Sequence, residues 1–119
     1  MAKKDHLAKR NVWVATVRPD GRPHLAPVWF VVSDGKWYVV TAPDSVKARN
    51  LQRNDQISLA LEDGDDPYVV EGRARPVAPS AEVIRLFKQK YDWDITVDST
   101  YTQTIEVVVH KTRGGSANL

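Results

Sequence analysis

Three short runs of β-branched and aromatic residues, separated by Asp-Gly turns, constrain the fold of this chain more than any other feature. The runs are VWVATV at Val12–Val17, HLAPVWFVV at His24–Val32 and WYVVT at Trp37–Thr41. Such residues favour strands, and the Pro-Asp-Gly and Ser-Asp-Gly sequences between the runs favour tight turns. The sequence therefore predicts an antiparallel meander of three strands over this region.

The remainder of the chain continues the strand pattern. Further strands are predicted at residues 57–62, 68–77 and 103–110. In the first of these, Ile57, Leu59 and Leu61 alternate with smaller or polar residues and should share a buried face. In the second, Val70, Gly72 and Ala74 are predicted to share one face. The tail at residues 112–119 is rich in Gly and Ser and is predicted to be frayed.

Two helices interrupt the strands, and a third is predicted at the start. Residues 46–53 follow Asp44 and Ser45, either of which can cap a helix, and Val46 and Leu51 are its predicted anchors. Residues 81–91 follow Ser80 and carry an apolar stripe at helical spacing, made of Val83, Ile84, Phe87 and Tyr91. Residues 2–10 suit a short helix with Leu7 as its main apolar anchor.

Six strands that follow one another as hairpins, rather than in βαβ alternation, indicate the fold class. We predict a mainly β protein, a six-stranded antiparallel barrel that is closed or nearly closed, with two or three short helices. The 119 residues fit one domain spanning 1–119.

Composition excludes several classes of protein. The chain has no cysteine, so disulfides, thiolate metal sites and cysteine nucleophiles are impossible. It has no apolar run of the roughly 18–20 residues that a membrane helix needs, and its first ten residues do not resemble a signal peptide. We therefore expect a cytoplasmic protein that does not bind membranes. Residues 1–53 carry a net charge of +6 and residues 54–119 a net charge of −4, so an anionic partner, either a nucleic acid or a phosphate-bearing small molecule, is one interpretation.

Most chemical motifs are missing. His6, His24 and His110 lack metal-ligand spacing and are interpreted as surface or edge residues. The acidic turn Asp63–Asp66 departs from a calcium loop and is predicted to be solvent-exposed and free of metal. No glycine-rich nucleotide loop and no nucleophile motif occurs, and no convincing acid–base pair is present.

One constellation can bind an anion. Residues 41–50 lead from a strand end into the start of a helix, where free N–H groups and the helix dipole favour phosphate. Thr41 and Ser45 add hydroxyl groups, and Lys47 and Arg49 add positive charges. Residues 47 and 49 do not share one helix face, so one of them alone could point at the anion. The alternative is a capped helix with a solvated basic face.

The ordered pattern VATV, DG-x-P, PVWF, a strand ending in Thr, S-x-K-x-R-N-L and SLAL, within residues 14–61, resembles the pyridoxamine phosphate oxidase-like split-barrel flavoproteins. With Glu71–Ala74 the resemblance covers about two-thirds of the chain. It implies a six-stranded split β-barrel that forms a homodimer. It also implies FMN, or in one branch the deazaflavin F420, bound along the dimer interface, and an oxidoreductase activity.

The resemblance also assigns residues. Thr41, Ser45 and Lys47 would hold the cofactor phosphate, and the main chain of Pro27, Val28, Trp29 and Phe30 would line the flavin ring. Arg49, in the sequence K-x-R-N-L, is similar to a feature of the F420-using branch of the family. The full predicted cofactor-binding set consists of Pro27, Val28, Trp29, Phe30, Val40, Thr41, Ala42, Ser45, Lys47 and Arg49.

Departures from the family pattern argue against vitamin B6 oxidation. Ala26 and Val31 stand where true pyridoxamine phosphate oxidases have Arg and Lys, and the C-terminal Arg/His motif is missing. The substrate, and the choice between FMN and F420, stay open. Two alternatives are a non-catalytic cofactor carrier and a small-barrel protein that binds nucleic acid. The resemblance to the flavoproteins favours a protein without a nucleic-acid partner. Among the tryptophans, Trp13 and Trp37 are predicted in the barrel core, and Trp29 and Trp93 in a ligand or dimer groove.

Overall fold

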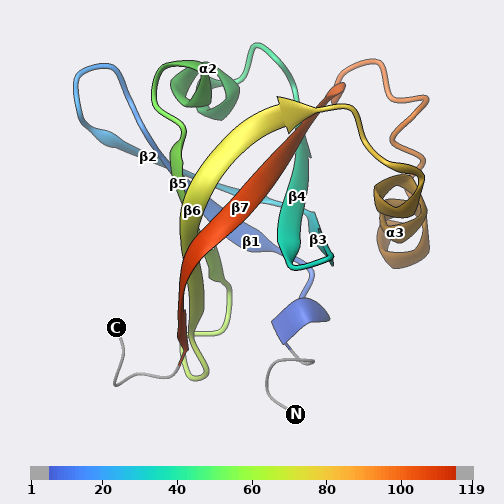
Figure 1. Ribbon diagram of the computed structural model, residues 1–119, viewed down its shortest axis with the longest axis horizontal. Coiled ribbons are helices and arrows are strands. Elements are labelled where there is room, and N and C mark those ends of the chain that lie inside the picture. The colour runs from blue at the N-terminus through green and yellow to red at the C-terminus, as the bar shows by residue number, and fades with distance from the viewer. Residues whose placement is uncertain (1–5, 115–119) are drawn as a thin grey trace.

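The computed structural model describes residues 6–114 and shows a strongly curled antiparallel sheet with two helices against its outside (Figure 1). In chain order the elements are β1 (Val12–Val17), β2 (Pro23–Val28), β3 (Phe30–Ser33), β4 (Lys36–Thr41), α2 (Val46–Arg53), β5 (Gln56–Leu61), β6 (Tyr68–Val77), α3 (Ala81–Tyr91) and β7 (Gln103–Gly114). No helix within these residues is both long and apolar enough to cross a bilayer.

The strands follow the order β2-β1-β5-β6-β7-β4-β3, so β2 and β3 form the two edges of the sheet. These edge strands are consecutive in the chain, with Trp29 alone between them. A sheet whose two edges are joined by a single residue must curl back on itself, and this half-barrel confirms the mainly β split-barrel prediction. The long strands β6 and β7 curve across it (Figure 1).

The strand count differs from the prediction because the run His24–Val32 is two strands. Residues 23–28 pair with β1, and residues 30–33 pair with β4. The interruption at Trp29 lets the chain leave one edge of the sheet and join the other. The predicted three-strand meander is therefore two hairpins, β1–β2 and β3–β4, at opposite edges.

A single apolar core fills the inside of the curled sheet, with Leu59 and Phe30 among its fully buried members. The predicted face of β5 is confirmed, because all three of its alternating aliphatic residues are buried. Trp37 is buried here as predicted. Trp13 is not, since Val12 and Val14 fill the inward positions of β1 and leave Trp13 40% exposed. The core consists of Val12, Val14, Phe30, Trp37, Val39, Ile57, Leu59, Leu61, Val70, Ala74, Ile105 and Val107.

The helix α3 forms a second, outer core against β3. Val83, Phe87 and Tyr91 from its predicted stripe are buried, while Ile84 is partly buried at the edge of the cluster. The Ser80 side chain accepts a hydrogen bond from the Val83 N–H (3.1 Å) and caps the helix.

The helix α2 has the predicted bounds, and Ser45 rather than Asp44 caps it. Its fully buried residues are Ala48 and Asn50. Of the two predicted anchors, Leu51 is partly buried and packs against the core, as predicted, whereas Val46 is partly buried outside both apolar clusters. Asn50 Nδ2 donates to Thr16 Oγ1 (3.0 Å) on β1. This bond fastens the helix to the barrel through a polar pair that an apolar pattern does not reveal.

Both ends of the described chain differ from the prediction. The strand β7 runs to Gly114 because residues 112–114 pair with β6, so only residues 115–119 of the predicted tail lie outside the described residues. Of the predicted first helix, residues 2–5 lie outside them as well. Leu7 is 42% exposed, and His6 is the buried side chain, with Nε2 3.0 Å from Asp66 Oδ2. His6 is thus not the surface residue that its sequence context indicates.

The acidic turn at residues 63–66 is only partly exposed. Asp65 is exposed, whereas Asp63 and Asp66 are partly buried and face the N-terminal segment. Lys9 Nζ lies 3.8 Å from Asp63 Oδ2. These carboxylates therefore hold the start of the chain against the β5–β6 hairpin.

Candidate functional site

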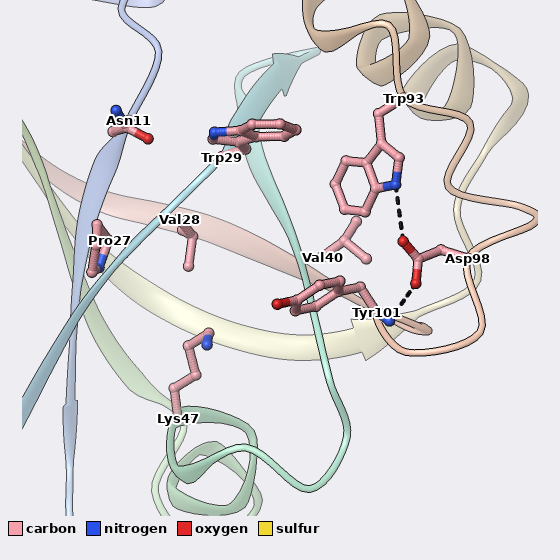
Figure 2. Close-up of a pocket in the computed structure, with 9 residues that line it drawn as sticks. All are labelled: Asn11, Pro27, Val28, Trp29, Val40, Lys47, Trp93, Asp98 and Tyr101. Atoms are coloured by element: carbon pink, nitrogen blue, oxygen red, sulfur yellow. Dashed lines mark hydrogen bonds between the residues drawn. The ribbon is translucent and has the colours of Figure 1, made fainter.

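A pocket of about 480 Å³ opens beside the point where β2 ends and β3 begins (Figure 2). Five parts of the chain meet there: the residue before β1, the β2–β3 junction, β4, the first turn of α2 and the segment between α3 and β7. The lining residues are Asn11, Pro27, Val28, Trp29, Val40, Lys47, Trp93, Asp98 and Tyr101. Most of this lining is apolar or aromatic, and Lys47 is the one cation among the described lining residues.

Trp29, the residue that separates β2 from β3, is held by aromatic neighbours. Its ring stacks on Tyr91 at 4.4 Å with the planes 5° apart, and Trp93 meets it edge-on at 5.7 Å. The Arg10 guanidinium lies 4.6 Å from its ring centre. These contacts fix the indole at the pocket wall, where Figure 2 shows it across from Lys47.

Tyr91 is the support beneath Trp29. Its hydroxyl accepts a hydrogen bond from the Phe30 N–H (2.9 Å) and lies within donating distance of the Arg10 carbonyl oxygen (2.8 Å). Burial raises the pKa of Tyr91 to about 12, so the phenol stays protonated at neutral pH. The tyrosine thus ties α3 to the β2–β3 junction and to the segment before β1.

Lys47 extends from the first turn of α2 into the pocket (Figure 2). It is partly buried, and burial lowers its pKa below the usual value of 10.5. Within residues 6–114, no carboxylate lies within ion-pair distance of its amino group. Lys47 is therefore a partly desolvated cation without an ion-pair partner among the described residues, in a pocket that also contains the carboxylate of Asp98.

The two predicted hydroxyl ligands, Thr41 and Ser45, are not among the lining residues of the pocket, and their hydroxyl groups hydrogen-bond each other. Thr41 Oγ1 and Ser45 Oγ are 2.9 Å apart, and Ser45 Oγ also accepts from the Ala48 N–H (3.2 Å). Thr41 is buried. Both side chains therefore fix the turn from β4 into α2, and Ala42, partly buried, lies within that turn.

Arg49 lies apart from Lys47. It lines a separate hollow of about 340 Å³ formed by the β1–β2 turn and the outer face of α2. Arg18, Arg22 and Arg53 line the same hollow. The structure therefore brings Lys47, but not Arg49, to the aromatic pocket. Residues two positions apart on a helix are rotated by about 200° about its axis, so their side chains lie on nearly opposite faces.

The other predicted residues divide in the same way. Pro27, Val28, Trp29 and Val40 line the pocket. Phe30 does not, because its side chain is fully buried and stacks on Trp37 at 5.1 Å. Its main-chain groups are engaged as well, since its N–H donates to Tyr91 and its carbonyl oxygen accepts from Lys90 Nζ (3.1 Å).

Three lining residues were not predicted: Asn11, Asp98 and Tyr101. Asp98 and Tyr101 belong to the irregular segment 92–102, where no periodic pattern exists to indicate which side chains point inward. The one available signal was the density of aromatic residues, which led to the prediction for Trp93. Trp93 and Trp29 both line the pocket. Their contact with a ligand or with a second copy of the chain stays a prediction.

The chain is a curled split barrel, and its pocket combines aromatic side chains with a lysine that has no ion-pair partner within residues 6–114. Aromatic faces suit flat rings and a lysine suits an anion. The family comparison agrees with the resemblance in the sequence. A family model described as "Pyridoxamine 5'-phosphate oxidase" matches residues 4–114, so the chain belongs to this family. None of the curated proteins compared with the chain matches it in sequence.

Solved structures share the fold. A conserved hypothetical protein, Rv2991 of Mycobacterium tuberculosis, is similar with a TM-score of 0.75 and 29% identity, over 92% of this chain and 79% of that one. The heme storage protein HutZ of Vibrio cholerae is similar with a TM-score of 0.76 and 19% identity, over 93% and 89%. A protein described as an F420 reductase has a TM-score of 0.72 and 21% identity, over 92% and 94%.

Proposed function

We propose that this protein binds a phosphate-bearing flavin, FMN, in the aromatic pocket and acts as an oxidoreductase, with F420 as the alternative cofactor. The observation that carries the proposal is Lys47, a partly buried cation without an ion-pair partner in residues 6–114, at a pocket lined by Trp29, Trp93 and Tyr101. A phosphate would supply the missing counter-charge. The aromatic side chains suit a flat ring.

The size of the pocket supports this assignment. Small-molecule sites commonly have volumes of roughly 300–1,000 Å³, and this pocket of about 480 Å³ lies within that range. A bound flavin would supply the electron and hydride chemistry. The chain's own residues would bind the phosphate through Lys47, orient the ring through Trp29 and exclude water through the wall at Trp93 and Tyr101.

Vitamin B6 oxidation is not part of the proposal. Ala26 is partly buried and Val31 is buried, and neither can offer the charge that the true oxidases have at these positions. A cofactor carrier is the second candidate. A carrier is favoured because few side chains that could transfer protons line the pocket. Among the described lining residues the ionisable ones are Lys47, Asp98 and Tyr101, and Asp98 is already hydrogen-bonded within its own segment.

We also infer a homodimer, in which a second copy covers the pocket. Trp13 on β1 and Leu25 on β2 are 40% and 61% exposed, and the β1–β2 register places them near Pro27 and Ala15 on the outer face of these strands. An exposed apolar group of this kind is typical of an interaction surface. A cytoplasmic site of action belongs to the same proposal and is consistent with the absence of cysteine.

Cofactor titration tests the proposal directly. The purified protein is titrated with FMN, with F420 and with haem, and binding is followed by fluorescence quenching, or by absorbance for haem. Saturable binding of FMN or F420 at one site per chain is expected, and steady turnover of the reduced cofactor would distinguish an enzyme from a carrier. Binding of haem alone, or of neither flavin nor deazaflavin, would contradict the proposal.

A further inference from the structure

The segment between α3 and β7 contains one carboxylate whose hydrogen bonds organise a wall of the pocket. Asp98 Oδ2 accepts from Trp93 Nε1 (3.1 Å), and Oδ1 accepts from the N–H groups of Thr100 (2.9 Å) and Tyr101 (2.8 Å). Figure 2 shows the bonds to Trp93 and Tyr101, both of which line the pocket. The N–H groups of Tyr101 and Thr100 hold the pKa of Asp98 below its usual range, so the carboxylate is ionised at neutral pH.

The indole that Asp98 holds is the centre of an aromatic cluster. The Trp93 ring meets Trp29 edge-on at 5.7 Å, Phe87 at 5.5 Å and Tyr101 at 6.2 Å. Edge-to-face contacts of this kind depend on the angle between the rings. A rotation of Trp93 would therefore disturb the contacts with Trp29 and Tyr101, the other two aromatic residues of the pocket.

Regular secondary structure does not hold this wall in place. Residues 92–102 form turns and bends between α3 and β7, without a strand partner. The segment is held by Ile95, which is buried in the outer core, and by the side chains of Asp94 and Asp98, which accept hydrogen bonds from residues two or three positions later. Asp94 bonds Thr96, which does not line the pocket, whereas the partners of Asp98 include two residues that do.

We propose that Asp98 is a positioning residue that fixes Trp93 and Tyr101 against the planar ring of the ligand, while Lys47 binds its phosphate. This inference rests on the proposed function, because it assigns the two ends of the same pocket to two parts of one ligand. It predicts that substitutions can weaken binding of the ring and binding of the phosphate independently.

The test compares Asp98→Asn with the matched control Asp94→Asn in the same segment. An amide at position 98 can still accept from the two N–H groups, but its NH₂ group would face the Trp93 N–H, so this bond is lost. The probes are FMN or F420, whichever the unaltered protein binds, its ring compound without phosphate, and inorganic phosphate. The readouts are the dissociation constant of each probe, the NMR signal of the Trp93 indole N–H and the unfolding midpoint.

Asp98→Asn should weaken binding of the cofactor and of the phosphate-free ring by up to about tenfold, the range of one aromatic contact. It should leave the affinity for inorganic phosphate unchanged and shift the indole signal. Asp94→Asn should leave all three affinities unchanged, and Lys47→Ala should weaken phosphate more than the ring. If Asp98→Asn is unstable, Trp93→Phe removes the same hydrogen bond from the other side and should give the same ranking of probes.

Two results would overturn the inference while leaving the proposed function intact. In the first, Asp98→Asn binds the ring compound as tightly as Asp94→Asn. In the second, it weakens inorganic phosphate as much as the ring, which is the result expected from general loosening of the fold. If the unaltered protein binds neither cofactor, the proposed function fails and this inference falls with it.

Discussion

Replacing Lys47 by alanine is the sharpest test of the phosphate assignment. The lysine carries a charge that burial makes costly, and no carboxylate in residues 6–114 forms an ion pair with it. A phosphate at this position would form a charge-assisted hydrogen bond worth about 1.5–3 kcal/mol. Lys47→Ala should therefore weaken FMN or F420 binding by about ten- to a hundredfold. It should not lower the free energy of unfolding without ligand, because it removes a desolvated charge.

The control is Arg53→Ala on the same helix. Arg53 lies in the separate basic hollow with Arg49, so its loss should leave cofactor affinity nearly unchanged. Each variant is titrated with cofactor by fluorescence quenching at two salt concentrations. Equal losses for both substitutions, with a steep salt dependence, would show that anions bind by diffuse electrostatics over the basic half of the chain. The assignment of Lys47 to a phosphate would then be refuted.

Three further predictions concern packing, assembly and pH. Gly72→Ala should lower the free energy of unfolding, measured by urea titration, by about 1–3 kcal/mol, because its Cβ would clash with the Val108 carbonyl oxygen. Gly64→Ala, where a Cβ would meet open space, should change the free energy of unfolding little in the same urea titration. Leu25→Glu should convert the proposed dimer to a monomer in light scattering, whereas Val108→Glu, three strands away from β1, should not. Burial lowers the pKa of Lys90 to about 8, so between about pH 8 and 10.5 the unfolded chain holds the Lys90 proton more tightly than the folded chain does. The free energy of unfolding, measured relative to Lys90→Met, should therefore rise with pH over this range. A difference between the two proteins that does not change with pH would contradict this.

The elements that the sequence predicted best are those with local signals. The bounds of β1, β6, α2 and α3 agree with the prediction because serine caps, Asp-Gly turns and alternating apolar residues act over a few positions. The break at Trp29 was missed for the opposite reason. Residues 24–32 read as one strand, and only the choice of partners, β1 for the first half and β4 for the second, divides it. That choice depends on contacts distant in sequence.

The candidate site shows the same division. Lys47, Pro27, Val28, Trp29 and Val40 were predicted through a pattern shared with a family, and all of them line one pocket. Asp98 and Tyr101 come from the irregular segment after α3, and only the folded chain places them opposite the β2–β3 junction. Helical geometry separates Arg49 from Lys47, although the two are neighbours in the motif.

Trp29 connects the fold to the pocket. Because it stands between two strands that pair with different neighbours, it takes no position in either register and its side chain is free to turn toward α3. There it stacks on Tyr91, whose hydroxyl in turn accepts from the N–H of the next residue, Phe30. The break that lets the sheet curl into a barrel thus also exposes an indole at the pocket wall. A regular strand at residues 24–32 would remove both, so the aromatic wall of the proposed ligand pocket and the curl of this sheet depend on the same interruption.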